Sequence, residues 1–253
     1  MALRPDTRFQ LRTDSMSAGM ARDAAIDVGL RQYMLRVYNY MASGLALTGV
    51  VAYLVASTPA VLQLLYQPTG TGGYAPTMLA WIAMFSPLAF ILVMNFGLHK
   101  MKASTLQMVF WAFAAVMGVS MSSIFLTFTG ASIARVFFIS ASMFLAMSIY
   151  GYTTKRDLSG MGSFLMMGLV GIIVASIVNI FLASSGLHFV ISVVGVLVFV
   201  GLTAFDTQKI KSMYMVSDSG EIATKKAVMG ATTLYLDFIN LFMMLLHLFG
   251  NRE

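Results

Sequence analysis

Two aspartates stand in apolar sequence where a charge is costly. Asp237 lies within residues 234–240, about 16 Å beyond Lys226 if the segment is a helix that rises about 1.5 Å per residue. Asp206 closes the preceding apolar stretch, directly before Thr207. A charge at the centre of a bilayer costs at least about 2.5–3.5 kcal/mol, so such a residue normally faces protein or water and has a function.

The two aspartates would form a proton-sensitive unit if their side chains met. Like charges a few Å apart cannot both ionise readily, so the pair would take up and release a proton. Clustered carboxylate and carbonyl oxygens also suit Ca²⁺. Asp206 and Asp237 are therefore the candidate pH sensor or gate and the candidate transient Ca²⁺ ligands, and no resident cofactor is expected.

A few polar residues are placed to line a path beside the aspartates. Thr233 and Asn240 lie four residues before and three after Asp237, so the three share one helix face. Asn95 and Asn179 also stand in apolar sequence, and each could equally make a hydrogen bond between helices.

The composition is that of a membrane protein. The chain has 253 residues, of which 58% are hydrophobic and 10% charged, whereas a soluble domain has about 25% charged residues. No charged residue occurs within 37–99, 103–134, 136–154 or 158–205. A helix needs roughly 20 mostly apolar residues to cross a bilayer, so we expect an all-α membrane protein with several spans.

Apolar blocks and turn-forming residues divide the chain into seven predicted spans. The turn-rich residues 67–73 and 184–186 separate spans, and the last segment is long enough to cross fully, although re-entry would reduce the count to six. The predicted spans are 38–56, 76–98, 106–128, 136–152, 163–183, 187–207 and 227–249.

Basic residues predict the orientation. Of 16 Lys and Arg, all but Arg135 and Arg252 fall before the first span or in the second, fourth and sixth loops. By the positive-inside rule the N-terminus is cytoplasmic and the C-terminus lies outside. The distribution of basic residues thus accounts for the net charge of +6. The predicted partner is a lipid bilayer, and no nucleic acid is expected to bind. Residues 1–32 are predicted to be a polar cytoplasmic tail, with a short surface helix over 16–30, and residues 33–253 the membrane domain.

The sequence contains no motif that indicates an enzyme. Intramembrane aspartyl proteases also use two aspartates, but neither Asp206 nor Asp237 stands in a Gly-x-Gly-Asp motif. His188 and His247 are isolated in the sequence and lie near the predicted outer side, so no catalytic triad or metal site is expected from them. The chain has no cysteine. We expect a protein that is not an enzyme.

Three segments resemble the Bax inhibitor-1 family. Residues 118–125 (GVSMSSIF), continuing through 127–130, are similar to its signature region, and residues 144–151 with 154–158 to its fourth span and following loop. Residues 234–242 (LYLDFINLF) closely match its last helix. The resemblance covers nearly everything after Arg31 and implies a bacterial member located in the inner (plasma) membrane.

The resemblance implies both a fold and a function. The fold has seven transmembrane helices, with the last helix central and enclosed by the other six. In bacterial relatives the family is associated with a pH-dependent calcium leak attributed to two aspartates, which match Asp206 and Asp237. A basic residue at the cytoplasmic end of the second helix latches the first of them. That position is Lys100, with His99 beside it, where relatives can carry arginine. A lysine latch would be less directional, because lysine is a point charge.

Two functions remain open. The first is a pH-sensitive channel or leak for calcium, gated by the aspartate pair, with Ca²⁺ and H⁺ as partners. The second is a regulator that binds other membrane proteins, such as a membrane-bound protease or stress and cell-death machinery, without itself conducting ions.

Overall fold

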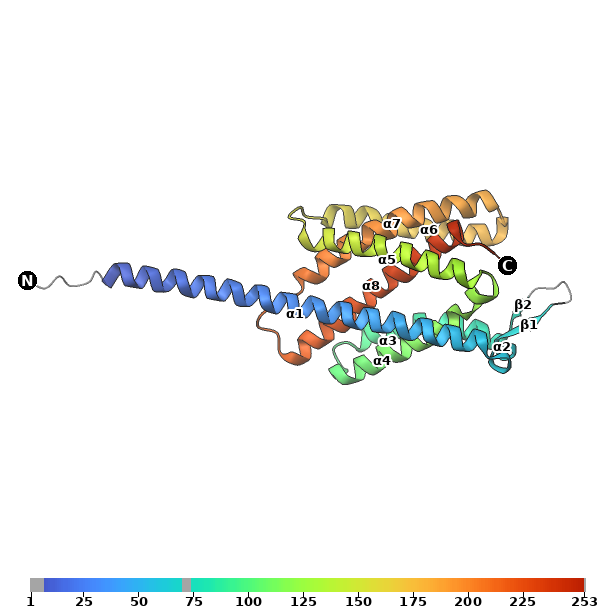
Figure 1. Ribbon diagram of the computed structural model, residues 1–253, viewed down its shortest axis with the longest axis horizontal. Coiled ribbons are helices and arrows are strands. Elements are labelled where there is room, and N and C mark those ends of the chain that lie inside the picture. Colours follow the sequence, from blue (N-terminus) through green and yellow to red (C-terminus); the bar gives the residue numbers. More distant parts are fainter. Residues whose placement is uncertain (1–6, 70–73, 253) are drawn as a thin grey trace, which may run out of the picture.

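A computed structural model describes the backbone of residues 7–69 and 74–252 and the side chains from residue 27 onward. Within these residues, seven helices are long and apolar enough to cross a membrane (Figure 1). The predicted class and the number of spans are confirmed. The elements are α1 (Thr7–Ser57), α2 (Pro59–Leu65), β1 (Tyr66–Pro68), β2 (Tyr74–Pro76), α3 (Met78–Gly97), α4 (Ala103–Met121), the 3-10 helix η1 (Ser122–Leu126), α5 (Gly130–Thr153), α6 (Ser159–Leu182), α7 (Ser185–Ser212) and α8 (Gly220–Phe249).

The first helix is longer than the sequence predicted. The apolar part of α1 covers Asp27–Ser57, and the helix continues back to Thr7 without a break. The predicted surface helix over 16–30 and the first span are therefore parts of one helix. Residues 31–37 between them contain no Gly or Pro that could end it. The predicted boundary between residues 32 and 33 falls inside α1 and stays a prediction.

The segment between the first two spans is structured rather than a simple loop. Pro59 begins α2, since its missing N–H costs nothing in the first turn. The strands β1 and β2 then pair in antiparallel fashion, with Tyr66 opposite Pro76. Tyr66 is buried with Leu65 and Val55 in a small separate core. The sequence analysis missed these elements because seven-residue helices and three-residue strands show no clear periodicity.

Side-chain caps define where several spans begin. The hydroxyl oxygens of Thr77, Thr129, Ser184 and Ser219 each accept a hydrogen bond from the backbone N–H three residues later. Such caps satisfy donors that the first helical turn leaves unpaired. Between α6 and α7, Ala183 adopts a left-handed conformation with φ 48°, which reverses the chain at the predicted break.

The last span occupies the middle of the bundle. α8 lies between a group formed by α1, α3 and α4 and a group formed by α5, α6 and α7 (Figure 1). It packs against α1, α4, α5 and α7, and 67% of its apolar window is buried, the highest share of the seven. The main partners of α3 and α6 are α4 and α7, respectively. The central position of α8 is thus observed, and its enclosure by all six other helices stays a prediction.

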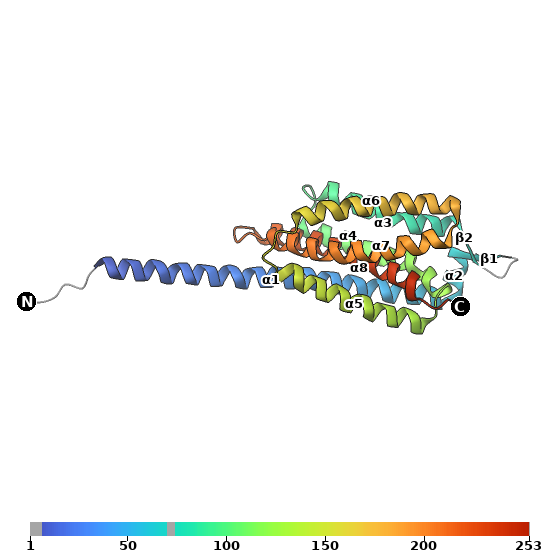
Figure 2. The ribbon, with the colours of Figure 1, turned by 90° about the horizontal axis from the view of Figure 1, so that it is seen from above.

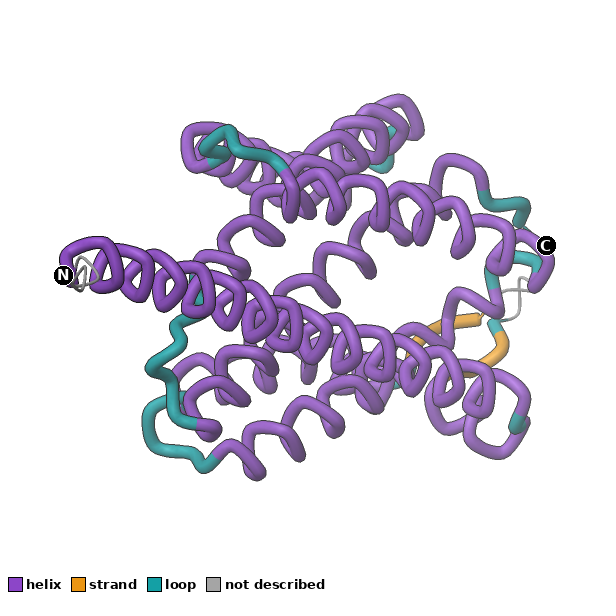
Figure 3. Tube along the Cα trace, turned by 60° about the vertical axis from the view of Figure 1, so that its left-hand side comes forward, coloured by secondary structure: helices purple, strands orange, loops and turns teal. Residues whose placement is uncertain are grey.

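The helices run along one common direction, so loops gather at two ends of the bundle (Figure 2). One end holds the turns α3–α4, α5–α6 and α7–α8, and these turns and the helix ends beside them carry eight Lys and Arg residues. The other end holds the β hairpin and the C-terminus (Figure 3). We refer to them as the basic end and the hairpin end.

Two glycines let helices of the bundle touch through their backbones. A Cβ atom on Gly151 of α5 would lie 2.2 Å from the carbonyl oxygen of Ala204 in α7. A Cβ atom on Gly118 of α4 would lie 2.7 Å from the carbonyl oxygen of Thr48 in α1. Small residues at helix contacts allow the close packing that holds membrane bundles together, since lipid supplies no hydrophobic drive between helices.

Candidate functional site

The structure brings Asp206 and Asp237 together. Asp206 lies in the second half of α7 and Asp237 near the middle of α8, and the two residues are only 8% and 6% exposed. The two carboxyl groups lie within interaction range of each other. Ionised carboxylates accept hydrogen bonds but cannot donate one, so a hydrogen bond between them would need a proton on at least one of the two groups.

The pair is incompletely satisfied. The Oδ2 atom of Asp237 is buried without a hydrogen-bond partner in the described part of the chain. An unpaired buried carboxyl oxygen is costly and calls for a proton, a cation or water. The positive charge that acts on Asp206 is that of Lys209, one helical turn further along α7. The pair therefore lies between the apolar core and the basic end.

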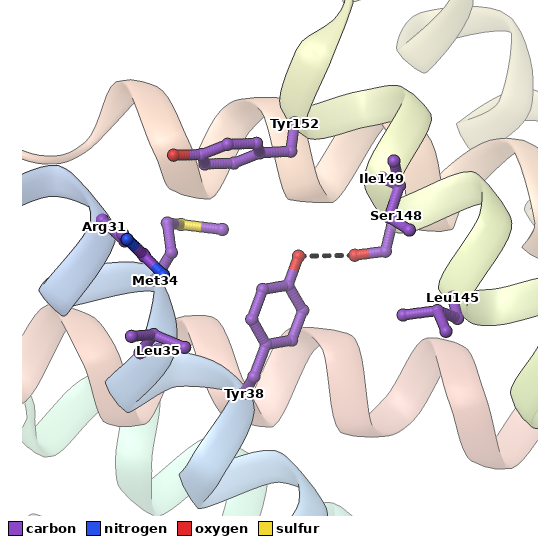
Figure 4. Close-up of a pocket in the computed structure, with 8 residues that line it drawn as sticks. All are labelled: Arg31, Met34, Leu35, Tyr38, Leu145, Ser148, Ile149 and Tyr152. Carbon is purple, nitrogen blue, oxygen red and sulfur yellow. Dashed lines mark hydrogen bonds between the residues drawn. The ribbon is translucent and has the colours of Figure 1, made fainter. Parts of the chain in front are cut away.

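A row of hydroxyl groups begins beside the pair and was not expected from the sequence. Thr207 follows Asp206 and is fully buried, and its hydroxyl lies 3.1 Å from the hydroxyl of Ser148 in α5. Ser148 in turn is 2.5 Å from the hydroxyl of Tyr38 in α1 (Figure 4). Hydroxyl groups both donate and accept, so such a row can pass a proton along. Serine and threonine are too common in helices for the sequence to single these out.

Tyr38 stands in the wall of a groove between α1 and α5. The groove has a volume of about 330 Å³. Its lining is apolar apart from Arg31 and the hydroxyls of Tyr38, Ser148 and Tyr152 (Figure 4). The hydroxyl row thus connects the side of the bundle with a buried position next to Asp206.

A second buried polar contact joins α8 to α1 and α4. The hydroxyl of Thr48 in α1 donates to the carbonyl oxygen of Ala114 in α4 at 2.8 Å, and the hydroxyl of Tyr235 in α8 lies 2.7 Å from the Thr48 oxygen. Since Thr48 uses its hydrogen on Ala114, Tyr235 is the donor to Thr48. Tyr235 is fully buried, so this contact satisfies an otherwise costly hydroxyl.

The four predicted path-lining residues make local hydrogen bonds within their own helices or turns. Thr233 and Asn240 lie half-buried on α8 and donate to the backbone carbonyls of Met229 and Leu236. Asn95 is exposed on α3 and donates to the carbonyl of its own helix. The side-chain oxygen of Asn179 accepts from the N–H of Ser184 at the hairpin end.

The predicted latch is not formed in this structure. Lys100 and His99 are both exposed at the end of α3, whose main partner is α4 rather than α7. The described residues contain no ion pair between Lys100 and Asp206. The basic residue that acts on Asp206 is instead Lys209, on the same helix.

The sequence suggested that His188 and His247 are isolated, but the structure brings them into contact. The imidazole rings of His188 in α7 and His247 in α8 lie edge to face with centroids 4.9 Å apart. They are 59 positions apart in the sequence, and the sequence analysis missed the contact because it depends on how α7 and α8 pair. Among the described residues, no group of three or more His, Cys, Asp or Glu side chains is placed to hold a metal ion.

These features define a class: a multi-pass helical membrane protein with a buried carboxyl pair on its two most buried helices. Residues 30–253 match the family Bax1-I, described as Inhibitor of apoptosis-promoting Bax1. The chain belongs to this family, the Bax inhibitor-1 family, which confirms the resemblance seen in its sequence.

Several curated bacterial proteins are similar over nearly their whole length. The inner membrane protein YbhL of Escherichia coli (strain K12) is 46% identical over 227 residues, which cover 89% of this chain and 94% of YbhL. The uncharacterized protein RP147 of Rickettsia prowazekii is 50% identical over 233 residues, covering 92% and 95%. An uncharacterized membrane protein of Streptococcus pyogenes, SpyM3_0260, is 35% identical over 230 residues, covering 90% and 96%.

Proposed function

We propose that this chain is a pH-sensitive leak pathway for Ca²⁺, with Asp206 and Asp237 as its gate. The observation that carries the proposal is the buried carboxyl pair between α7 and α8, with one oxygen of Asp237 left unpartnered. Carboxylate oxygens are ligands that Ca²⁺ prefers. Two carboxyl groups are too few to hold Ca²⁺ firmly, which suits an ion that passes rather than stays.

Protonation would act on the gate through charge. An ionised pair places negative charge between α7 and α8, where Lys209 of α7 also acts on Asp206. This charge can hold a basic group of another helix at the basic end. A proton taken up by the pair removes negative charge, which releases that group and lets hydrated cations enter. Lys100 remains the latch partner that the family resemblance implies, and such a contact needs α3 to approach α7.

The hydroxyl row gives the proton a route. Thr207, Ser148 and Tyr38 connect the neighbourhood of Asp206 with the groove between α1 and α5. Protons can exchange along hydrogen-bonded hydroxyls without a wide water-filled opening. The pair can therefore respond to pH while its surroundings stay closely packed.

The location proposed for the chain is the inner membrane, as the name of YbhL states for that protein. The basic end faces the cytoplasm in this proposal, together with the N-terminus, and the hairpin end with the C-terminus faces outward. The chain acts as a conduit and not as an enzyme, and it needs no resident cofactor.

The proposal is tested by Ca²⁺ flux into proteoliposomes that contain a calcium-sensitive dye. Asp206→Asn and Asp237→Asn keep the size of each side chain and remove its titration. We expect both variants to change the flux and to flatten its dependence on pH. Glu221→Gln is the matched control, since Glu221 is an exposed carboxylate of α8 paired only with Lys225. Wild-type flux and pH response in both aspartate variants would exclude the pair as the gate.

A second function is favoured by the length of α1. The helix begins at Thr7, whereas its apolar window begins at Asp27, and the extra part extends beyond the bundle (Figure 1). Such an extension could dock on another membrane protein, such as a membrane-bound protease. Deletion of residues 2–26 separates the two functions. If the shortened protein loses its co-purifying partners but keeps its Ca²⁺ flux, regulation is favoured. If it loses the flux, and neither the full-length nor the shortened protein has a co-purifying partner, the leak is favoured.

A further inference from the structure

A second group of side chains with coordinating ability lies at the hairpin end. His188 in the first turn of α7 and His247 in the last turn of α8 form the pair of rings described above. Together with Met244 they line a cavity of about 250 Å³ that α6 closes with Ser176 and Asn179. Along α7 this cavity is about 27 Å from Asp206, at about 1.5 Å per residue, so it is separate from the carboxyl pair.

The imidazole nitrogens are the polar groups of this cavity that other residues leave unused. Ser192 donates its hydroxyl to the backbone carbonyl of His188, and the side-chain oxygen of Asn179 accepts from Ser184. Neither histidine ring has a hydrogen-bond partner in the described part of the chain. A polar atom that lines a cavity without a partner is open to an external ligand.

Glycine makes room for the third group. A Cβ atom on Gly195 of α7 would lie 2.8 Å from both the Cγ and the Sδ atoms of Met244. The missing side chain therefore lets the thioether of Met244 lie directly against α7, one turn of α8 from His247. Any larger residue at position 195 would push the sulfur away from this place.

We propose that His188, His247 and Met244 bind one Cu(I) ion. Imidazole suits zinc, copper, iron and nickel, whereas a thioether selects Cu(I), so copper is the metal that both ligand types accept. The ring separation of 4.9 Å suits two imidazoles on one ion, because metal–nitrogen bonds are about 2.0–2.1 Å.

The charges around the cavity favour a monovalent ion. Among the described residues, no carboxylate lines it. The positive charge of Arg252 acts on His247, and its guanidinium lies 5.9 Å from the ring of Phe128, which is itself 6.3 Å from the His247 ring. A divalent ion such as Zn²⁺ would meet twice the repulsion that Cu(I) meets at the same distance.

The test is a titration of the purified full-length protein in detergent with Cu(I), held by a coloured chelator under reducing conditions. We expect the wild type to withdraw one equivalent of Cu(I) from the chelator. His188→Gln and His247→Gln should each lower the affinity at least about tenfold, since even the loss of an outer-shell partner costs 10–100-fold. Met244→Leu should also lower it. The controls are His99→Gln and Met229→Leu, which alter the third histidine and another methionine of α8 near the basic end.

A spectroscopic measurement on the wild type removes any dependence on how the variants fold. X-ray absorption of the Cu(I)-loaded protein should show two nitrogen ligands and one sulfur ligand. Coordination by sulfur alone would place the ion among other methionines and overturn the proposal. The same conclusion follows if the histidine variants bind Cu(I) as the wild type does, or if Zn²⁺ binds more tightly than Cu(I).

Discussion

Burial decides what each carboxyl group of this chain can do. Asp206 and Asp237 are withdrawn from solvent and lie within interaction range of each other, so they cannot both ionise readily. Asp157, in the turn between α5 and α6, is exposed and serves the local backbone: its Oδ1 atom accepts from the N–H of Ser159 at 2.9 Å. Hydrogen bonds from the side chain and the backbone of Ser159 lower the pKa of Asp157.

The lowered pKa of Asp157 predicts how its contribution to stability depends on pH. A group whose pKa is depressed by folding stabilises the folded state above its ordinary value of 3.8, and loses that effect as the pH falls through the folded value. Asp157→Ala should therefore lower the melting temperature at pH 7, and the difference should shrink progressively as the pH falls below 3.8. Thermal unfolding in detergent across this range checks it. A difference that stays constant with pH would show that Asp157 does not act through its charge.

Replacing Ser148 should affect both the stability of the protein and the access of protons to the carboxyl pair. Ser148→Ala removes the middle of the hydroxyl row and leaves Thr207 and Tyr38 without these contacts. We expect a loss of about 1–3 kcal/mol in unfolding free energy, and a slower change of Ca²⁺ flux after a pH step.

The control for this prediction is Ser142→Ala on the same helix. Ser142 is exposed and donates to the carbonyl of Phe138 in its own helix, so its effect should stay within about 0.5 kcal/mol. If both variants respond to a pH step as fast as the wild type, the hydroxyl row is not a proton route.

The contact between helices α5 and α7 depends on Gly151. Its missing side chain allows α5 to meet the backbone of Ala204 directly. We expect Gly151→Ala to cost about 1–3 kcal/mol of unfolding free energy, because backbone atoms cannot move aside as a flexible side chain can. Gly171→Ala in α6 is the control, since nothing lies within 4 Å of the added atom, and it should stabilise the protein by roughly 0.5–1 kcal/mol. Equal melting temperatures for the two variants would contradict the close approach.

Long elements were predictable and short ones were not. Apolar length fixed the seven spans, and the turn residues at 184–186 marked the break that Ala183 and Ser184 make. Small polar residues before α3, α5 and α8 cap those helices through single hydrogen bonds. The position of such a bond depends on the backbone geometry, so the sequence did not predict where each helix begins. The segment from Pro59 to Pro76 escaped prediction because its stability comes from Tyr66 and Leu65 packing against α1 and α3, which is tertiary and not local.

At the scale of the whole molecule, the distribution of charge predicts orientation in the membrane. The absence of cysteine from the natural sequence makes single-cysteine labelling clean. Ser217→Cys places a thiol in the exposed turn between α7 and α8, and Asn251→Cys places one at the hairpin end. In intact cells, a membrane-impermeant maleimide should label the thiol at position 251 and spare the one at position 217. Labelling in the reverse pattern would invert the proposed topology.

The sequence predicted only some of the residues of the candidate site. Asp206 and Asp237 stood out because a charge in apolar sequence is costly, and the structure brings them together as the pattern indicated. The predicted contact between Lys100 and Asp206 is absent from the structure, because it depends on where α3 packs. The pairing of His188 with His247 needed the three-dimensional structure, since each residue alone is an ordinary histidine near a helix end.

The shared proton of the carboxyl pair can be measured directly by infrared spectroscopy. At neutral pH the account predicts the carbonyl band of a protonated carboxyl group in the wild type and in Glu221→Gln. Asp206→Asn and Asp237→Asn should each alter this band, since each carboxyl group influences the ionisation of the other. A wild-type spectrum at neutral pH with every carboxyl group ionised would contradict the account.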